Sequence, residues 1–183
     1  MLEIEQAARL AEQLLATDLP VRWQHVRCVA DKASKTGARI LPPREAGILT
    51  AAAWLHDIGY APKIRKTGFH PLDGAEFLRE AEFSIQIVSL VANHSAAQTR
   101  AREEKIPFDS LLYPREITPL ADALWFSDMT TGPHGEDFSF AERMAEIRVR
   151  HNNDPKALQA MQHTEPELAA AVQRTLQRLT EMK

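Results

Sequence analysis

Apolar residues recur every three or four positions along most of the chain, which is the spacing of one face of an α-helix. Proline, glycine and polar clusters interrupt this pattern at short intervals, and the alternation typical of strands is scarce. Helices are predicted over residues 2–16, 19–36, 44–58, 71–81, 84–96, 117–129, 139–151, 155–162 and 165–181. The fold class that follows is all-α, with the helices arranged as a single-domain bundle.

Two of the predicted helix starts carry a capping box, in which a hydroxyl and a carboxylate satisfy each other's backbone amides. The pairs are Ser139 with Glu142 and Thr164 with Glu167. Loops are expected between the helices, at residues 37–43, 59–70, 97–116 and 130–138. The stretch 97–116 is long for a structureless connection in a compact domain, so we expect it to act as a lid or flap.

Polar side chains interrupt the apolar faces of four predicted helices. They are His25, His56, His94 and Asp128. Each is separated from apolar residues of its own helix by three or four positions, so each side chain is expected to point inward. A histidine at such a position is more often a hydrogen-bonded core residue than a metal ligand. A lone buried carboxylate must instead be paired, protonated or bound to a metal, and a divalent ion shared with the histidines would give Asp128 its partner.

Two further candidates lie near His56 in the sequence or in the expected fold. Asp57 follows His56 directly, and the pair precedes a glycine at the predicted end of a helix. His70 precedes Pro71, which suits the first turn of a helix, so His70 is expected near a helix start. That position tolerates many polar residues, but the loop 59–70 could also fold His70 back over the His56-Asp57 pair.

The length of 183 residues indicates one domain spanning 1–183, with a core over about 20–150 and the C-terminal helices over 155–181 packed on it. The formal net charge of −3 gives no global basic field, so a nucleic acid polymer is not expected as a partner. Cys28 is the single cysteine, which excludes an intrachain disulfide and a cysteine-based zinc cluster and is typical of a reducing compartment. Because no apolar stretch is long enough to span a membrane, we expect a cytoplasmic protein without a membrane partner.

The order of these polar residues resembles the HD superfamily of metal-dependent phosphohydrolases over about residues 20–150. The match is carried by His25, by His56 and Asp57 in "LHDIG", and by Asp128 in "LWFSDMTTGP". The resemblance implies an all-helical fold of the HD-domain type in which these four side chains bind a divalent metal. Asp122, in "LADALW", fits the pattern of the last ligand less well than Asp128.

The longer pattern, which adds His70 and His94, is similar to members of that superfamily that hold two metals. In those terms Asp57 is a candidate bridge between the two ions. Because the ligands are imidazoles and carboxylates without a thiolate, the expected cofactor is one or two ions of Mn, Fe, Co, Ni or Zn.

Many members of the superfamily carry a lysine directly after the glycine of the motif, whereas this chain has Tyr60. Lys63 is the expected substitute in a general-acid role, and Asp57 and Lys63 are therefore the expected catalytic residues. The cations Lys63, Arg65 and Lys66 form a basic patch that is expected to bind the substrate phosphate. A solvated loop is the alternative interpretation of that patch.

The expected function is hydrolysis of a nucleotide or another small phosphate ester through a metal-activated water. A mixed-valence di-iron oxygenase acting on a small polyol or phosphonate would use the same ligand pattern, so the residues leave that alternative open. A non-catalytic regulatory module that only binds metal is the third interpretation. The expected partner is a small phosphorylated substrate, and assembly into a homo-oligomer is left open.

Overall fold

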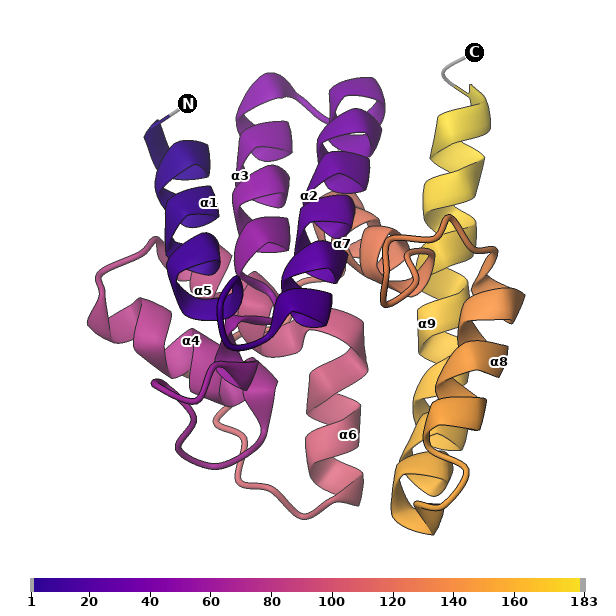
Figure 1. Ribbon diagram of the computed structural model, residues 1–183. Helices are drawn as coiled ribbons and strands as arrows, with labels where there is room; N and C mark the ends of the chain where they lie inside the picture. Colours follow the sequence, from indigo (N-terminus) through magenta and orange to yellow (C-terminus); the bar gives the residue numbers. More distant parts are fainter. Residues whose placement is uncertain (1, 182–183) are drawn as a thin grey trace.

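A computed structural model describes residues 2–181, and helices form most of this part of the chain (Figure 1). The elements are α1 (Leu2–Leu15), α2 (Pro20–Ile40), α3 (Pro43–Leu55), the 3₁₀ turn η1 (Ile58–Tyr60), α4 (His70–Glu80), α5 (Ile85–Asn93), the 3₁₀ turn η2 (His94–Ala96), α6 (Ala97–Glu103), α7 (Pro119–Met129), α8 (Phe140–Arg150) and α9 (Pro155–Glu181). Within residues 2–181 no strand forms, and the only β-type pairing is an isolated bridge between Thr131 and Asp137. The all-α prediction is confirmed.

The centre of the fold is a layer of helices in which α2 packs against α3 and α7, while α3 also packs against α1 and α5. Figure 1 shows α1, α3 and α2 side by side and α8 antiparallel to α9. Helix α7 packs against α9. Val26 of α2, Leu49 of α3 and Leu124 of α7 are completely buried between these helices. One apolar cluster extends from α1 to α9 and forms the wall against which the polar residues described below are held.

The helix starts follow local chemistry. Ser139 and Glu142 form the predicted capping box at α8, with the Ser139 hydroxyl accepting from the Glu142 amide (3.2 Å) and the carboxylate accepting from the Ser139 amide (2.7 Å). Thr118 caps α7 in a similar way by accepting from the Ala121 amide. These caps fix where α7 and α8 begin, and both helices contribute side chains to the candidate site.

The predicted break between residues 162 and 165 is wrong, because α9 is continuous across Pro166. The hydroxyl of Thr164 donates to the Met161 carbonyl (3.2 Å) instead of capping a new helix with Glu167. A proline inside a helix costs about 3 kcal/mol. Apolar residues of α9 on both sides of it are buried against neighbouring helices, including Ala160 and Leu168, and this packing outweighs the local preference.

Two predicted loops are also shorter than expected. Helix α2 continues to Ile40, since Gly37 is buried where α2 crosses α3 and a β-carbon there would lie 3.2 Å from Ala46. The stretch 97–116 begins with α6, whose residues Ala97 and Ala101 are buried, so only its remainder is irregular.

The predicted helices 44–58 and 84–96 end earlier, at Leu55 and Asn93, and each continues into a 3₁₀ turn. No helix within residues 2–181 is both long enough and apolar enough to cross a membrane.

Candidate metal centre

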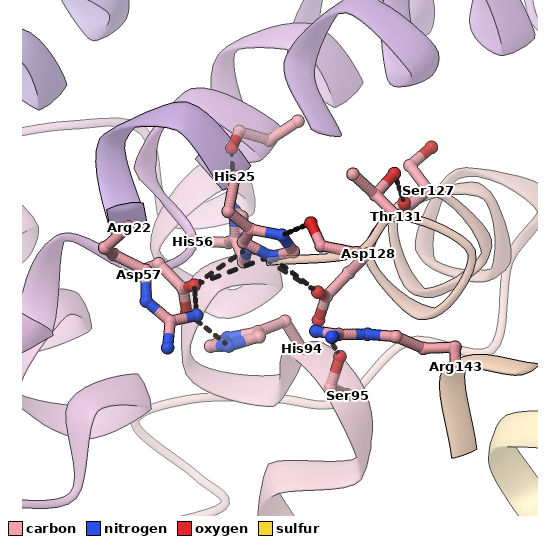
Figure 2. Close-up of polar contacts among 12 residues, drawn as sticks. Arg22, His25, His56, Asp57, His94, Ser95, Ser127, Asp128, Thr131 and Arg143 are labelled. Carbon is pink, nitrogen blue, oxygen red and sulfur yellow. Dashed lines mark hydrogen bonds and ion pairs between the residues drawn. The ribbon is translucent and has the colours of Figure 1, made fainter. Parts of the chain in front are cut away.

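The six candidate ligands lie on different elements and meet in one buried cluster, and Figure 2 labels all of them except His70. They are His25 of α2, His56 at the end of α3, Asp57 before η1, His70 at the start of α4, His94 at the start of η2, and Asp128 of α7. None of them is more than 7 % exposed. Burying so many polar side chains together is costly unless they satisfy one another or a bound ion.

The cluster consists of two groups of three ligands, and within each group the ligand atoms lie within 4.8 Å of one another. The first group is His25, His56 and Asp128; the second is Asp57, His70 and His94. In the first, Oδ1 of Asp128 lies 3.1 Å from Nε2 of His25 and 3.9 Å from Nε2 of His56. In the second, the two Nε2 atoms of His70 and His94 are 3.1 Å apart.

Asp57 connects the two groups through its two carboxylate oxygens. Its Oδ2 lies 3.4 Å from Nε2 of His56 and 3.8 Å from Nε2 of His25. Its Oδ1 lies 3.2 Å from Nε2 of His70 and 3.6 Å from Nε2 of His94. One oxygen therefore faces each group, which is the placement needed for a carboxylate that bridges two cations.

Backbone carbonyls fix the orientation of three of the imidazoles. Nδ1 of His56 is 2.7 Å from the Ala53 carbonyl, and Nδ1 of His94 is 2.6 Å from the Val91 carbonyl. Nδ1 of His25 is 3.0 Å from a further carbonyl, that of Gly132. Because a carbonyl only accepts, each Nδ1 carries the hydrogen, and in the neutral ring Nε2 presents its lone pair to the cluster.

The unsatisfied atoms of the cluster fit a bound cation. Nε2 of His56 is buried and has no hydrogen-bond partner. The Nε2 atoms of His70 and His94 face each other 3.1 Å apart, so one ion could accept the lone pairs of both rings. A divalent ion coordinated by nitrogen and carboxylate oxygen would satisfy these atoms, and the donor set suits Mn, Fe, Co, Ni or Zn.

The electrostatics of the metal-free cluster are unbalanced. Burial lowers the pKa of His56, but Asp57 and Asp128 outweigh it and raise that pKa to about 9. Burial raises the pKa of Asp57, but His56 and Arg22 hold it well below its usual range. The pKa of His70 is lowered to about 3, chiefly because its ring is buried. A proton on His56 thus compensates carboxylates whose charge a metal ion would otherwise balance.

A close backbone approach explains the glycine of the "LHDIG" motif. A β-carbon at Gly59 would lie 2.0 Å from the His70 carbonyl oxygen and 2.7 Å from the Gly74 amide nitrogen. No side chain fits there, because the obstructing atoms belong to the backbone of α4. Gly59 therefore allows η1 to press against the first turn of α4, which brings Asp57 beside His70.

Arg22 and Tyr60 also belong to the cluster, and the sequence interpretation missed Arg22. Nη1 of Arg22 donates to Oδ2 of Asp57 at 2.6 Å. Its guanidinium lies 4.3 Å from the centre of the Tyr60 ring, and that ring stacks on His70 with the centroids 3.9 Å apart. Arg22 precedes His25 by one helical turn, so the two residues lie on the same face of α2. The spacing that places His25 inward therefore also indicates that Arg22 lies near the site.

The backbone directly after His94 is strained. Ser95 and Ala96 have φ angles of 48° and 60°, in the left-handed region that residues other than glycine rarely adopt. The Ser95 hydroxyl donates to Oδ2 of Asp128, so this conformation holds a hydrogen bond to a candidate ligand. Such strain often accompanies functional sites.

A cavity of about 330 Å³ opens onto the cluster. Asp57, His70, His94 and Asp128 form one end of it, and α6, α8 and α9 form the remaining walls. Its cationic side chains are those of Arg22, Arg100, Arg143 and Arg150, and its apolar ones include Met129, Met144, Ile147, Met161 and Leu168. A larger cavity of about 690 Å³ lies between α2, α9 and the loop after α7, but none of the candidate ligands lines it.

The predicted basic patch is not part of this cavity. Lys63 and Arg65 are exposed, and Arg65 lines a separate pocket on the outer side of Arg22 and Tyr60. Lys66 is also exposed and forms an ion pair of 3.0 Å with Glu80. The fold brings all six predicted metal ligands together. The cations beside them are the cavity arginines and not the predicted patch of Lys63, Arg65 and Lys66.

The comparisons with known proteins agree with this geometry. A family model described as the HD domain matches residues 22–129, which is more than half of the chain. This range contains all six candidate ligands and ends before α8. Comparison with curated proteins and with solved structures found no match.

Proposed function

Since the chain belongs to the HD domain family, we propose that it is a metal-dependent phosphohydrolase that cleaves a nucleotide or another small phosphate ester. The observation that carries the proposal is the bridging position of Asp57, which faces one ligand group with each carboxylate oxygen. Two cations held on either side of such a bridge are suited to in-line displacement at phosphorus.

Each group of ligands has a defined task in this proposal. His25, His56 and Asp128 would hold one ion, and His70 and His94 the other, with Asp57 shared. When bound, divalent ions would polarise a phosphoryl oxygen and lower the pKa of a coordinated water. The carbonyl hydrogen bonds at Nδ1 of His25, His56 and His94 keep these rings aimed before any ion arrives.

Arg22 gives the site a cation where Tyr60 replaces the lysine of many family members. Its guanidinium contacts Asp57 and lies against the Tyr60 ring, so it is held at the edge of the cluster and the cavity. From this position it would attract a phosphoryl oxygen and reduce the repulsion between substrate and carboxylates. Lys63 remains a proposed general acid, although its side chain is exposed and does not line the cavity.

The size and lining of the cavity support a small substrate. A volume of about 330 Å³ is at the lower end of the range for small-molecule sites. Arginines near the cluster suit a phosphate, and the apolar side chains of Met144, Ile147 and Met161 suit a less polar group such as a nucleobase.

The test is a phosphate-release screen with the purified protein and added Mn²⁺, Co²⁺ or Ni²⁺. Substrates would include nucleoside mono-, di- and triphosphates, dinucleoside polyphosphates and an aryl phosphate. We expect turnover of at least one class, abolished in Asp57→Ala and unchanged in the control Asp31→Ala, whose exposed carboxylate pairs with Lys35. Inactivity on every ester would contradict the proposal, and oxygen uptake by the iron-loaded protein with a polyol or phosphonate would favour the oxygenase.

A further inference from the structure

Arg143 is a buried cation at the edge of the candidate site. It belongs to α8 and is 4 % exposed, although arginine is seldom fully buried unless it is paired. Its side chain lines the cavity, and Figure 2 shows the guanidinium extending from α8 toward Asp128 and Ser95. The residue therefore lies where a substrate group bound at the metal cluster would be.

The hydrogen bonds of Arg143 leave donor capacity unused. Nη1 donates to Oε2 of Glu146 at 2.5 Å, whereas Nε is buried and has no partner. Among residues 2–181, no ion pair within 4.0 Å joins Arg143 to Asp128 or to any carboxylate other than that of Glu146. A guanidinium offers five donors, and leaving them unsatisfied inside the protein costs free energy.

The charges around Arg143 favour an anion at this place. Glu146 also pairs with Arg150 at 3.0 Å, so one carboxylate is shared between two guanidinium groups. Elsewhere on the outer wall, Glu104 pairs with Arg100 at 3.3 Å and Asp154 accepts from amides at the start of α9. On α8 itself, the two arginines that line the cavity have a single carboxylate between them.

The remaining cavity arginines are bound to a candidate ligand or are less buried. Arg22 is bound to Asp57 and lies against Tyr60. Arg100 pairs with Glu104 and lies over Phe69, 4.4 Å from the centre of that ring. Its Nε also lacks a hydrogen-bond partner, but its side chain is 32 % exposed. Arg150 is exposed. Arg143 thus combines deep burial, free donors and a position beside Asp128.

We propose that Arg143 binds an oxygen of the phosphoryl group that reacts at the metal cluster, opposite the candidate ligands. The proposal rests on the phosphohydrolase function proposed above. Helix α8 lies outside residues 22–129, so this phosphate contact would be supplied by a part of the chain that the HD domain match does not cover. The planar guanidinium suits a phosphate because it can donate two parallel hydrogen bonds to it.

The experiment compares three variants of the full chain. Arg143→Met removes the charge and keeps much of the side-chain length, while Arg143→Lys keeps the charge and loses the planar fork. Arg148→Met is the matched control, because Arg148 is on the same helix but is 47 % exposed and does not line the cavity. Circular dichroism and metal content establish that each variant folds and retains its ions.

The first readout is binding of inorganic phosphate to the Mn²⁺-loaded protein by titration calorimetry. We expect Arg143→Met to weaken it about 10- to 100-fold, the range for losing a hydrogen bond to a charged group. Arg143→Lys should fall between that variant and wild type, and Arg148→Met should equal wild type. If Arg143→Met misfolds, the comparison of Arg143→Lys with Arg148→Met carries the test.

The second readout is kcat/KM for any ester that wild type hydrolyses, and it separates this proposal from the function itself. A loss of about 10²-fold or more in Arg143→Met supports the contact. Wild-type turnover together with unchanged kcat/KM and phosphate affinity in the Arg143 variants would overturn it and leave the phosphohydrolase proposal standing. Absence of turnover in wild type would count against the function alone, whereas failure of the metal-loaded wild type to bind phosphate would overturn the contact.

Discussion

Two aspartates of α7 are both buried, but the charges around them differ. Asp122 is 4 % exposed and accepts from Arg174 and from Arg178 of α9, each with a contact of 2.8 Å to its Oδ2. Asp128 is 7 % exposed and has instead an imidazole nitrogen of His25 at 3.1 Å and the hydroxyl of Ser95. The first carboxylate is paired with permanently charged side chains, and the second is not.

This difference separates a structural ion pair from a candidate site. The arginines of α9 are permanently charged, so Asp122 fastens α9 to α7 without any ligand. The partners of Asp128 are an imidazole and a hydroxyl, neither of which is permanently charged, and the buried Nε2 atom of His56 has no hydrogen-bond partner nearby. A buried carboxylate therefore indicates a binding site when its neighbours leave charge and lone pairs uncompensated.

The largest effect is expected from Asp128→Ala. It removes a ligand of the first group, so we expect loss of the ion held by His25 and His56 and a fall of phosphatase activity to the metal-free level. The variant should still fold, because α7 remains packed through residues such as Leu124. Elemental analysis and circular dichroism test both parts, and an unchanged metal content would remove Asp128 from the ligand set.

Asp122→Ala should have the opposite profile. We expect it to lower the free energy of unfolding by about 2–3 kcal/mol, because it leaves two arginines without their carboxylate, while metal content stays the same. The control Asp31→Ala, at an exposed position, should change the free energy of unfolding by less than about 0.5 kcal/mol. Urea denaturation measures both, and loss of metal in Asp122→Ala would erase the distinction between the two aspartates.

Gly59→Ala tests how the motif positions Asp57 against His70. Its β-carbon would meet the backbone of α4, so we expect destabilisation by about 1–3 kcal/mol and weaker binding at the His70 and His94 group. Gly47→Ala is the control in α3, where the new β-carbon finds only Ile4 at 3.9 Å, and it should stabilise by about 0.4–1 kcal/mol. Equal melting temperatures for the two variants would refute the close approach.

The metal affinity of the cluster should also depend on pH. The pKa of His56 is raised to about 9 in the metal-free cluster, so its imidazole is protonated at pH 7 and must lose that proton to bind an ion. Affinity should therefore rise by up to about tenfold per pH unit between pH 7 and 9 and level off above it. Calorimetry in buffers of different ionisation enthalpy should detect the released proton, and a buffer-independent heat would contradict it.

The same pKa shift predicts how the metal-free protein responds to pH. Because the pKa of His56 is raised above its ordinary value of 6.5, the charged form stabilises the fold. This contribution is fully present below about pH 6.5 and is lost as the pH rises through about 9. Thermal unfolding of the metal-free protein across that window measures it, and the control His56→Gln should lack this component of the pH dependence.

Much of the site could be predicted from the sequence, because four of the six ligands interrupt the apolar face of their own predicted helix. The three-and-four spacing placed His25, His94 and Asp128 inward, and the helices form around the same apolar residues. The position of His70 against Asp57 was harder, since it depends on the close approach at Gly59. That approach is a contact between two backbones, which the pattern of side chains does not record.

Other features depend on contacts between distant parts of the chain. The spacing from Phe140 and Ile147 places Arg143 on the apolar face of α8, but it does not indicate that α8 lies over the cluster. The ion pairs of Asp122 are formed by arginines that come much later in the sequence. Pro166 is a local signal that the packing of α9 overrides. In each case tertiary contacts decided what the local sequence left open.

The central claim is that the two ligand groups share Asp57 and hold two ions, and the number of metal ions per chain tests it most directly. Elemental analysis after reconstitution with Mn²⁺ and removal of excess ion should give two per chain for wild type, one for His94→Ala and none for Asp57→Ala. Chelation should also lower the melting temperature of wild type, because the ions bind the folded state. Metal content in Asp57→Ala equal to that of wild type, or no bound metal in wild type, would contradict the account.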